Sequence, residues 1–196
     1  MEGVTSGSVN TCIEMRIISG RYKGRRITVP PNFKARPTTD FAKENLFNIL
    51  HNWIDWEGLH ALDLFGGTGS ISFELVSRGC AKVVCVEKLP ANSSFIEKTQ
   101  KLLVANELQL YKADVFKYID ICKEQFDFIF ADPPYDLPYL EEVPSRILEK
   151  GLLKKGGVLV IEHSKINDFS ALPLYQEKRV YGGVNFSIFV NEESTE

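Results

Sequence analysis

The chain has 196 residues, of which 44% are hydrophobic and 25% charged, and its formal net charge is −3. These values are typical of one globular domain and exclude collagen, a coiled coil and a disordered chain. The longest apolar runs span only a few residues, so we expect no membrane-spanning helix and no membrane partner. Residues 1–11 lack the apolar core of a secretory signal peptide.

The four cysteines and three histidines are scattered along the chain, without the spacing of a zinc site. Cys80, Cys85 and Cys122 lie in apolar stretches that are typical of small buried residues. We therefore expect no metal site and a reducing, cytoplasmic environment.

The amino-terminal part of the chain is basic. Residues 13–43 contain eight Lys or Arg residues and only two acidic residues. The β-rich runs 16–19 and 25–29 flank a glycine-containing turn, which predicts a hairpin. A local basic face on an acidic chain is typical of a polyanion-binding surface. A solvated edge hairpin has the same composition, so both interpretations stay open at this point.

A helix is predicted over residues 40–53. A threonine hydroxyl precedes it as a potential cap, and Asp40 supplies an acid in its first turn. Apolar residues recur at helical spacing along it, so one face should pack inward. These residues are Leu46, Ile49, Leu50 and Trp53.

From His60 onward, predicted strands alternate with predicted helices. Strands are expected at 61–65, 82–86, 108–111, 126–130 and 158–161, with helices after the glycine loop, from Pro90, at 115–122 and at 140–149. The runs 177–181 and 185–190 flank Gly182-Gly183 and predict a closing antiparallel hairpin. This pattern predicts an α/β fold with a mostly parallel sheet and helices on both faces, whose ligands bind at the carboxyl ends of the strands.

The predicted organisation has four parts. Residues 1–14 are expected to be a disordered leader, 15–56 a basic hairpin and helix, 57–190 the α/β domain and 191–196 an acidic tail.

A glycine loop follows the first strand of the α/β domain, in the stretch Asp63 to Ser70. Its glycines allow a sharp turn and close approach to a ligand. Ser72 takes the place of the third glycine of a dinucleotide motif, and no P-loop lysine follows. The carboxylate of Asp63 would repel a pyrophosphate but attract an ammonium group. An ordinary tight turn is the alternative interpretation.

Acidic residues follow the next two strands. Glu87 lies twenty residues after Gly67, close to the spacing at which an acid accepts ribose hydroxyls. A solvated acid is the alternative for this residue. Asp114 can cap the following helix, hold an adenine amino group, or do both.

The stretch Asp132-Pro133-Pro134-Tyr135 follows the apolar strand 126–130. Two prolines stiffen the turn and leave carbonyl oxygens without local donors. A carboxylate, a fixed carbonyl and an aromatic ring together suit a planar exocyclic amine, whose ring would stack on Tyr135. A merely rigid loop is the alternative.

The glycine loop and Asp-Pro-Pro-Tyr together resemble the class I S-adenosylmethionine-dependent methyltransferases that act on exocyclic amines. The amino-terminal segments Arg16–Gly20, Lys23–Arg26 and Arg36–Asp40, with Glu44-x-Leu46-Phe47-Asn48, resemble the bacterial 16S ribosomal RNA guanine-N2 methyltransferases over residues 15–190. The sequence departs from that family at Phe41, Ala42 and Lys43, where arginines are usual, and Glu162-His163-Ser164 also matches it.

The resemblance implies a seven-stranded Rossmann-like domain and assigns roles to the candidate residues. Catalytic residues would be Asp132, Pro133, Pro134 and Tyr135. S-adenosylmethionine would be bound by Asp63, Phe65, Gly66, Gly67, Gly69, Glu87, Asp114 and Val115. RNA would be bound by Arg21, Lys23, Arg25, Arg26, Arg36, Thr38 and Thr39.

The implied substrate is a guanine of 16S rRNA, in an assembled or assembling small ribosomal subunit. We expect a monomer, although the hairpin at the sheet edge could also pair with a partner. Alternatives of the same class are amine methylation of tRNA guanine, DNA adenine N6 or a protein glutamine. Alternatives of other classes are a catalytically silent RNA-binding module and a nucleotide-dependent oxidoreductase.

Overall fold

The computed structural model describes residues 13–31, 33 and 39–192. Its main sheet has seven strands in the order β5-β4-β3-β6-β7-β9-β8. The strands from β5 to β7 in this order are parallel, and β9 runs antiparallel to both neighbours. The predicted Rossmann-like sheet with a closing hairpin is thus confirmed. The strands are β3 (His60–Leu64), β4 (Lys82–Val86), β5 (Leu108–Tyr111), β6 (Phe126–Ala131), β7 (Leu153–His163), β8 (Tyr175–Tyr181) and β9 (Val184–Val190).

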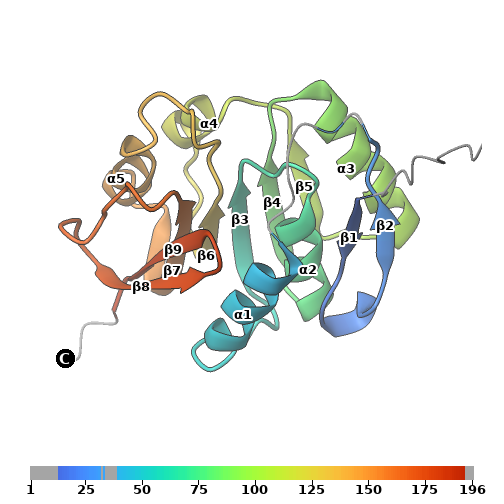
Figure 1. The fold of residues 1–196 in the computed structure, drawn as a ribbon, viewed down its shortest axis with the longest axis horizontal. Helices are drawn as coiled ribbons and strands as arrows, with labels where there is room; N and C mark the ends of the chain where they lie inside the picture. The colour runs from blue at the N-terminus through green and yellow to red at the C-terminus, as the bar shows by residue number, and fades with distance from the viewer. Residues whose placement is uncertain (1–12, 32, 34–38, 193–196) are drawn as a thin grey trace, which may run out of the picture.

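Helices cover both faces of this sheet (Figure 1). They are α1 (Asp40–Leu50), α2 (Ser70–Arg78), α3 (Pro90–Leu103), α4 (Val115–Ile121) and α5 (Glu142–Glu149). Successive strand residues point to opposite faces, so Phe128 and Phe130 pack with α1, α2 and α3, whereas Ile129 and Ala131 pack with α4 and α5. Burial on both faces explains why these strands read as continuous apolar runs.

The predicted amino-terminal hairpin is present. Strands β1 (Glu14–Arg16) and β2 (Arg26–Thr28) pair antiparallel, and a 3-10 turn, η1 (Gly20–Tyr22), lies between them. β1 begins at Glu14, inside the segment expected to be a leader; residues 1–12 lie outside the described residues. The hairpin and α1 share one apolar core with α2 and α3.

The structure differs from the sequence-based expectation at the end of the first helix and at Asn191. The Thr39 hydroxyl caps α1 as expected, but the helix ends at Leu50, and Trp53 is 45% exposed instead of packing inward. The chain turns away after the helix, and Trp56 fills the core in its place, against Phe128. At the carboxyl end, Asn191, the first residue of the expected tail, donates hydrogen bonds from Nδ2 to two β7 carbonyls and so packs against the sheet. Residues 193–196 lie outside the described part.

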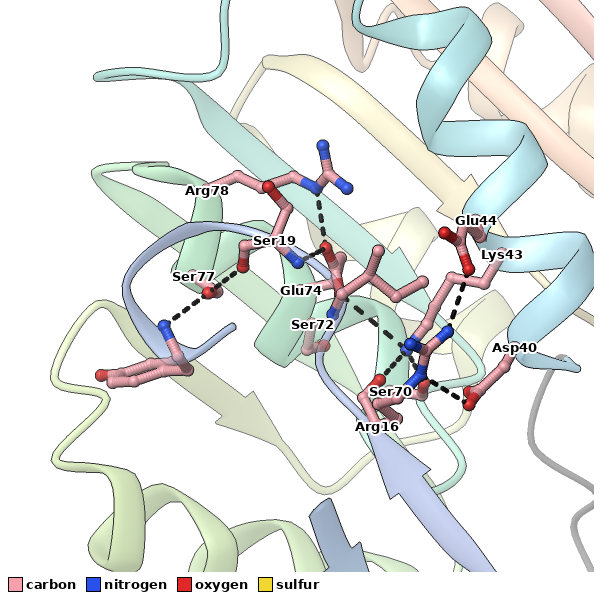
Figure 2. Close-up of polar contacts among 12 residues, drawn as sticks. Arg16, Ser19, Asp40, Lys43, Glu44, Ser70, Ser72, Glu74, Ser77 and Arg78 are labelled. Carbon is pink, nitrogen blue, oxygen red and sulfur yellow. Dashed lines mark hydrogen bonds and ion pairs between the residues drawn. The ribbon is translucent and has the colours of Figure 1, made fainter. Parts of the chain in front are cut away.

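A buried carboxylate on α2 fastens the hairpin to the sheet domain (Figure 2). Glu74 is fully buried and accepts hydrogen bonds from the backbone N–H groups of Ile18 and Ser19, at 2.8 and 3.1 Å. It also pairs with Arg78 at 2.8 Å and lies 3.9 Å from Lys43 Nζ. Lys43 in turn donates to the Arg16 carbonyl and to Ser70 Oγ.

Glu74→Leu should destabilise the protein by about 3–5 kcal/mol, because it leaves two buried cations without their carboxylate. Glu74→Gln, which keeps one acceptor oxygen, should cost less. Urea unfolding measures the free energy of unfolding. The matched control is Glu107→Gln, which removes the partly exposed partner of Arg21 and should cost less than about 1 kcal/mol. Equal losses in Glu74→Leu and the control would contradict the anchoring role.

Candidate active site

Parallel pairing brings the candidate residues to one edge of the sheet. Leu64, at the end of β3, pairs with Val86 on one side and with Ala131 on the other. The residues that follow these three are the start of the glycine loop, Glu87 and Asp132. Three separate motifs are therefore neighbours at the carboxyl edge of the sheet.

The glycine loop is a tight turn with left-handed backbone. Gly67 and Gly69 have φ values of 55° and 76°, which favour glycine, and Phe65 adopts φ 66° although it has a side chain. Gly66 has no room for a side chain, because a Cβ there would lie 2.3 Å from Cys85 Sγ. The turn is closed by a 2.6 Å hydrogen bond from Gly69 N to the Gly66 carbonyl. The loop backbone is thus tightly specified.

Glu87 is fixed against this loop and is not a solvated acid. Its side chain accepts hydrogen bonds from Gly67 N at 2.8 Å and from Leu89 N at 2.6 Å, and the residue is 6% exposed. Each carboxylate oxygen has a second lone pair, so Glu87 can still accept hydrogen bonds from a ligand.

Asp63 lies one residue before the end of β3 and is 2% exposed. Ser72 donates to its carboxylate from both N and Oγ, at 3.0 and 2.5 Å. Burial, reinforced by the nearby Glu87 carboxylate, outweighs these hydrogen bonds and raises the pKa of Asp63 to about 7. A ligand that brings a positive charge or hydrogen-bond donors would therefore stabilise the ionised Asp63 carboxylate.

Asp114 caps α4, as one of its two interpretations predicted. Its carboxylate accepts from Phe116 N and Lys117 N, and it pairs with Lys88. Val115 is buried beside it. The predicted contact of Asp114 with an adenine ring stays a prediction.

The Asp-Pro-Pro-Tyr turn follows β6 directly. Asp132 is partly buried, Pro133 is buried, and Pro134 and Tyr135 are exposed. Burial, reinforced by the Glu162 and Asp63 carboxylates, raises the pKa of Asp132 well above its usual range. The pKa of Tyr135 rises to about 12, through partial burial and the Glu162 and Asp132 carboxylates.

Glu162, at the end of β7, is 5% exposed and belongs to this acidic group. Its neighbour His163 bonds through Nε2 with Ser187 Oγ at 2.9 Å and through Nδ1 with the Ser164 carbonyl at 2.8 Å. His163 is therefore held inside the sheet, whereas Glu162 is placed beside Asp132.

The residues expected to bind RNA are spread over the hairpin and the start of α1. Arg21 and Arg26 form ion pairs with Glu107 and Glu14. Lys23 and Arg25 are exposed and have no ion-pair partner among the described residues. Thr39 is used as the helix cap, and Arg36 and Thr38 lie outside the described residues.

Two cations near this surface were not predicted as functional. Arg78 lies at the end of α2, and Arg16 pairs with Asp40 and Glu44 on α1. The spacing of Glu74 and Arg78, one helical turn apart, was the available signal. It predicts an ordinary surface pair, and only the fold shows that the pair is covered by the hairpin.

The described residues hold no group of three or more His, Cys, Asp and Glu side chains that could bind a metal ion. Cys80 and Cys85 are buried as expected, whereas Cys122 is only half-buried. Among the helices of the described ranges, none has the length and apolarity needed to cross a membrane.

Residues 15–190 match the family described as Conserved hypothetical protein 95. The chain belongs to this family. Similar curated proteins are named ribosomal RNA small subunit methyltransferase D. The one from Escherichia coli is 29% identical over 93% of each chain. The one from Haemophilus influenzae is 33% identical over 78% of this chain and 80% of the relative. The predicted membership of a family of ribosomal RNA methyltransferases is confirmed at this level.

Solved structures show the same fold. A hypothetical protein from Thermus thermophilus is 28% identical, with a TM-score of 0.77 over 89% of this chain and 98% of that chain. A 16S rRNA N2 methyltransferase from T. thermophilus, in complex with AdoMet and guanosine, is 18% identical. It has a TM-score of 0.69 over 92% of this chain and 50% of that chain, which supports the class I methyltransferase fold.

The raised pKa of Asp63 predicts how stability depends on pH. The folded state holds this proton more tightly than the unfolded state, so stability is fully present below the ordinary pKa and is lost as pH rises to about 7. The shift corresponds to at most about 4 kcal/mol. Relative to the wild type, Asp63→Asn should have a more favourable effect on the free energy of unfolding at pH 8 than at pH 4, as measured by urea unfolding of the unliganded protein. The exposed Asp55→Asn is the control, and identical pH profiles in both variants would show that Asp63 is not the responsible group.

Proposed function

We propose that this protein transfers a methyl group from S-adenosylmethionine to the exocyclic N2 amine of a guanine in ribosomal RNA of the small subunit. The observation that carries the proposal is the strand order β4-β3-β6, which sets Glu87, the glycine loop and Asp-Pro-Pro-Tyr side by side. The names of the relatives, ribosomal RNA small subunit methyltransferases, support the substrate.

The residues at this edge fit S-adenosylmethionine. The tight glycine loop leaves backbone open to a ligand, and the nearly buried Glu87 offers acceptors suited to ribose hydroxyls. Asp63 is a buried carboxylate with no cation beside it in the described residues, and it suits the ligand's ammonium group. The same acid at this position disfavours the pyrophosphate of a dinucleotide, and so the oxidoreductase alternative. When bound, S-adenosylmethionine supplies an electrophilic methyl group on a sulfonium.

The protein's part in the reaction is to orient the amine. The guanine N2 lone pair is delocalised into the ring, so the amine is a poor nucleophile. The Asp132 carboxylate and the Pro133 carbonyl would accept its two N–H bonds, while Tyr135 stacks on the base. These bonds favour the ionised form of Asp132, whose pKa is raised by burial in the free protein. Positioning then supplies much of the rate acceleration, and no dedicated general base is assigned.

The RNA would lie over the amino-terminal extension. Lys23 and Arg25 are exposed there, and Arg21 and Arg26 can exchange their carboxylate partners for phosphates. We propose a monomer acting on the assembled or assembling subunit.

The product of a labelling experiment tests the proposal directly. The protein is incubated with radiolabelled S-adenosylmethionine and, in parallel, with small ribosomal subunits, free 16S rRNA, tRNA, DNA and a release factor. Label in N2-methylguanine of 16S rRNA supports the proposal. Label in another substrate identifies one of the alternative amines, and no label in any of them favours a silent RNA-binding module.

Asp132→Ala should reduce kcat by roughly 30- to 1,000-fold, which corresponds to a loss of about 2–4 kcal/mol of transition-state stabilisation. The affinity for S-adenosylmethionine, measured by calorimetry, should stay within a few-fold, because the acid contacts the amine and not the ribose. Near-normal turnover of this variant would exclude the assigned role.

Glu87→Ala should weaken S-adenosylmethionine binding by about 1–3 kcal/mol, because two loop N–H groups and the ribose hydroxyls lose their acceptor. Glu87→Gln should fall between this variant and the wild type. The control is Glu97→Gln on α3, whose half-exposed carboxylate pairs with Lys112. An affinity as high in Glu87→Ala as in the control would contradict cofactor binding by Glu87.

A further inference from the structure

A groove of about 350 Å³ lies between the amino-terminal hairpin, α1 and the end of α2. Its cations are Arg16 and Lys23 from the hairpin segment and Arg78 from α2, and its other polar residues include Ser19, Asn48 and His51. Of these six, the sequence singled out only Lys23 as a functional residue.

Arg78 is the fixed part of this groove. Its Nε donates to Glu74 at 2.8 Å, its guanidinium lies 4.3 Å from the centre of the Phe47 ring, and its side chain is only 9% exposed. Figure 2 shows its two terminal nitrogens pointing away from Glu74. They have no acceptor in the part of the chain that the structure describes. A buried guanidinium with unused donors matches the paired oxygens of a phosphate.

The charges around Arg78 favour an anion. Glu44 also lines the groove and, like Asp40, pairs with Arg16, at 2.9 and 3.0 Å, so this cluster carries one net negative charge, which is outweighed by Lys23 together with the two cations at Glu74. Lys23 is exposed and adds a positive charge without an ion pair among the described residues. Glu74 faces Lys43 as well as Arg78, so two cations share one buried carboxylate.

One wall of the groove is formed by α1. Glu44, Asn48 and His51 are spaced so that they lie on one face of this helix and its end. Seven residues of helix rise about 10 Å, which is enough for consecutive phosphates of an RNA strand. Arg16, which lines the groove, accepts a 2.6 Å hydrogen bond at its carbonyl from the buried Lys43 Nζ, which also donates at 2.9 Å to Ser70 Oγ. Ser70 directly follows the glycine loop, so buried contacts connect the groove to the loop that would hold the cofactor.

We infer that this groove binds backbone phosphates of the RNA that flanks the target guanine, with Arg78 and Lys23 as the contacting cations. The inference rests on the proposed function and adds a binding site to it. Ser19 and Asn48 add neutral donors to the same phosphates. Since none of these groups reads a base, the contact fixes the position of the RNA without specifying its sequence.

Charge variants at Asn48 test the site without removing any buried group. Asn48 is exposed on α1, so Lys, Gln and Glu can each be accommodated there. Binding of transcribed 16S rRNA is measured as a function of KCl concentration. Asn48→Lys should steepen the salt slope by about 0.7–0.9 and Asn48→Glu should flatten it, with Asn48→Gln near the wild type. The same three substitutions at Gln176, exposed on β8 outside the groove, are the matched control.

Variants of Arg78 test the guanidinium itself. Arg78→Gln should flatten the slope by about 0.7–0.9 and weaken RNA binding about threefold. Arg78→Lys should keep the slope but lose affinity, because an ammonium cannot make the paired contact. S-adenosylmethionine affinity and the thermal midpoint show whether each variant is folded.

The outcomes separate the groove from the proposed function. If the wild type methylates 16S rRNA and the Asn48 series matches the Gln176 series, the groove inference is wrong and the methyltransferase proposal stands. If the wild type neither binds nor methylates 16S rRNA, both are wrong. Charge-dependent slopes at Asn48, together with the loss in Arg78→Gln, support the groove as a phosphate site.

Discussion

Four carboxylates lie close together at the carboxyl edge of the sheet, and the candidate active site depends on their burial and, secondly, on their mutual repulsion. Asp63, Glu87 and Glu162 are each at most 6% exposed, and Asp132 is partly buried beside them. Buried acids close to one another hold protons tightly, which is why the pKa values of Asp63 and Asp132 are raised. An unliganded site of this kind is destabilised, and ligands that bring an ammonium group, hydroxyls or an amine relieve the repulsion. The same groups that recognise such ligands therefore weaken the empty protein.

The parallel sheet and the buried Glu74 have two different structural roles. The sheet brings together acids that are far apart in the sequence, from Asp63 to Glu162. Glu74 holds a basic extension against the outside of the same domain through backbone N–H groups of the hairpin. Because Glu74 binds main-chain atoms, the anchoring leaves the hairpin's exposed side chains available for other contacts.

Local patterns in the sequence predicted most of the fold, because strands buried on both faces and helices with caps carry strong signals. The cap at Thr39, the glycine loop and Glu87 after β4 were found in this way. Trp53 was placed wrongly, since helical spacing continues past Leu50 while the backbone does not. The left-handed Phe65 and the role of Glu74 could not be predicted. The first depends on tertiary packing at the turn, and the second on a hairpin more than fifty residues away.

The separation of charge explains how an acidic chain can act on a polyanion. Phosphates would be repelled by the acids at the end of the sheet, whereas a base or a cofactor amine would be attracted to them. The cations of the proposed RNA-binding surface lie on the hairpin, the start of α1 and the end of α2, with Lys43 linking this region to the residue after the glycine loop. An RNA strand would therefore gain contacts only when its backbone lies on the extension and an amine-bearing base reaches the acids at the sheet edge. The acidic sheet edge and the basic extension together favour one orientation of the substrate, which neither could impose alone.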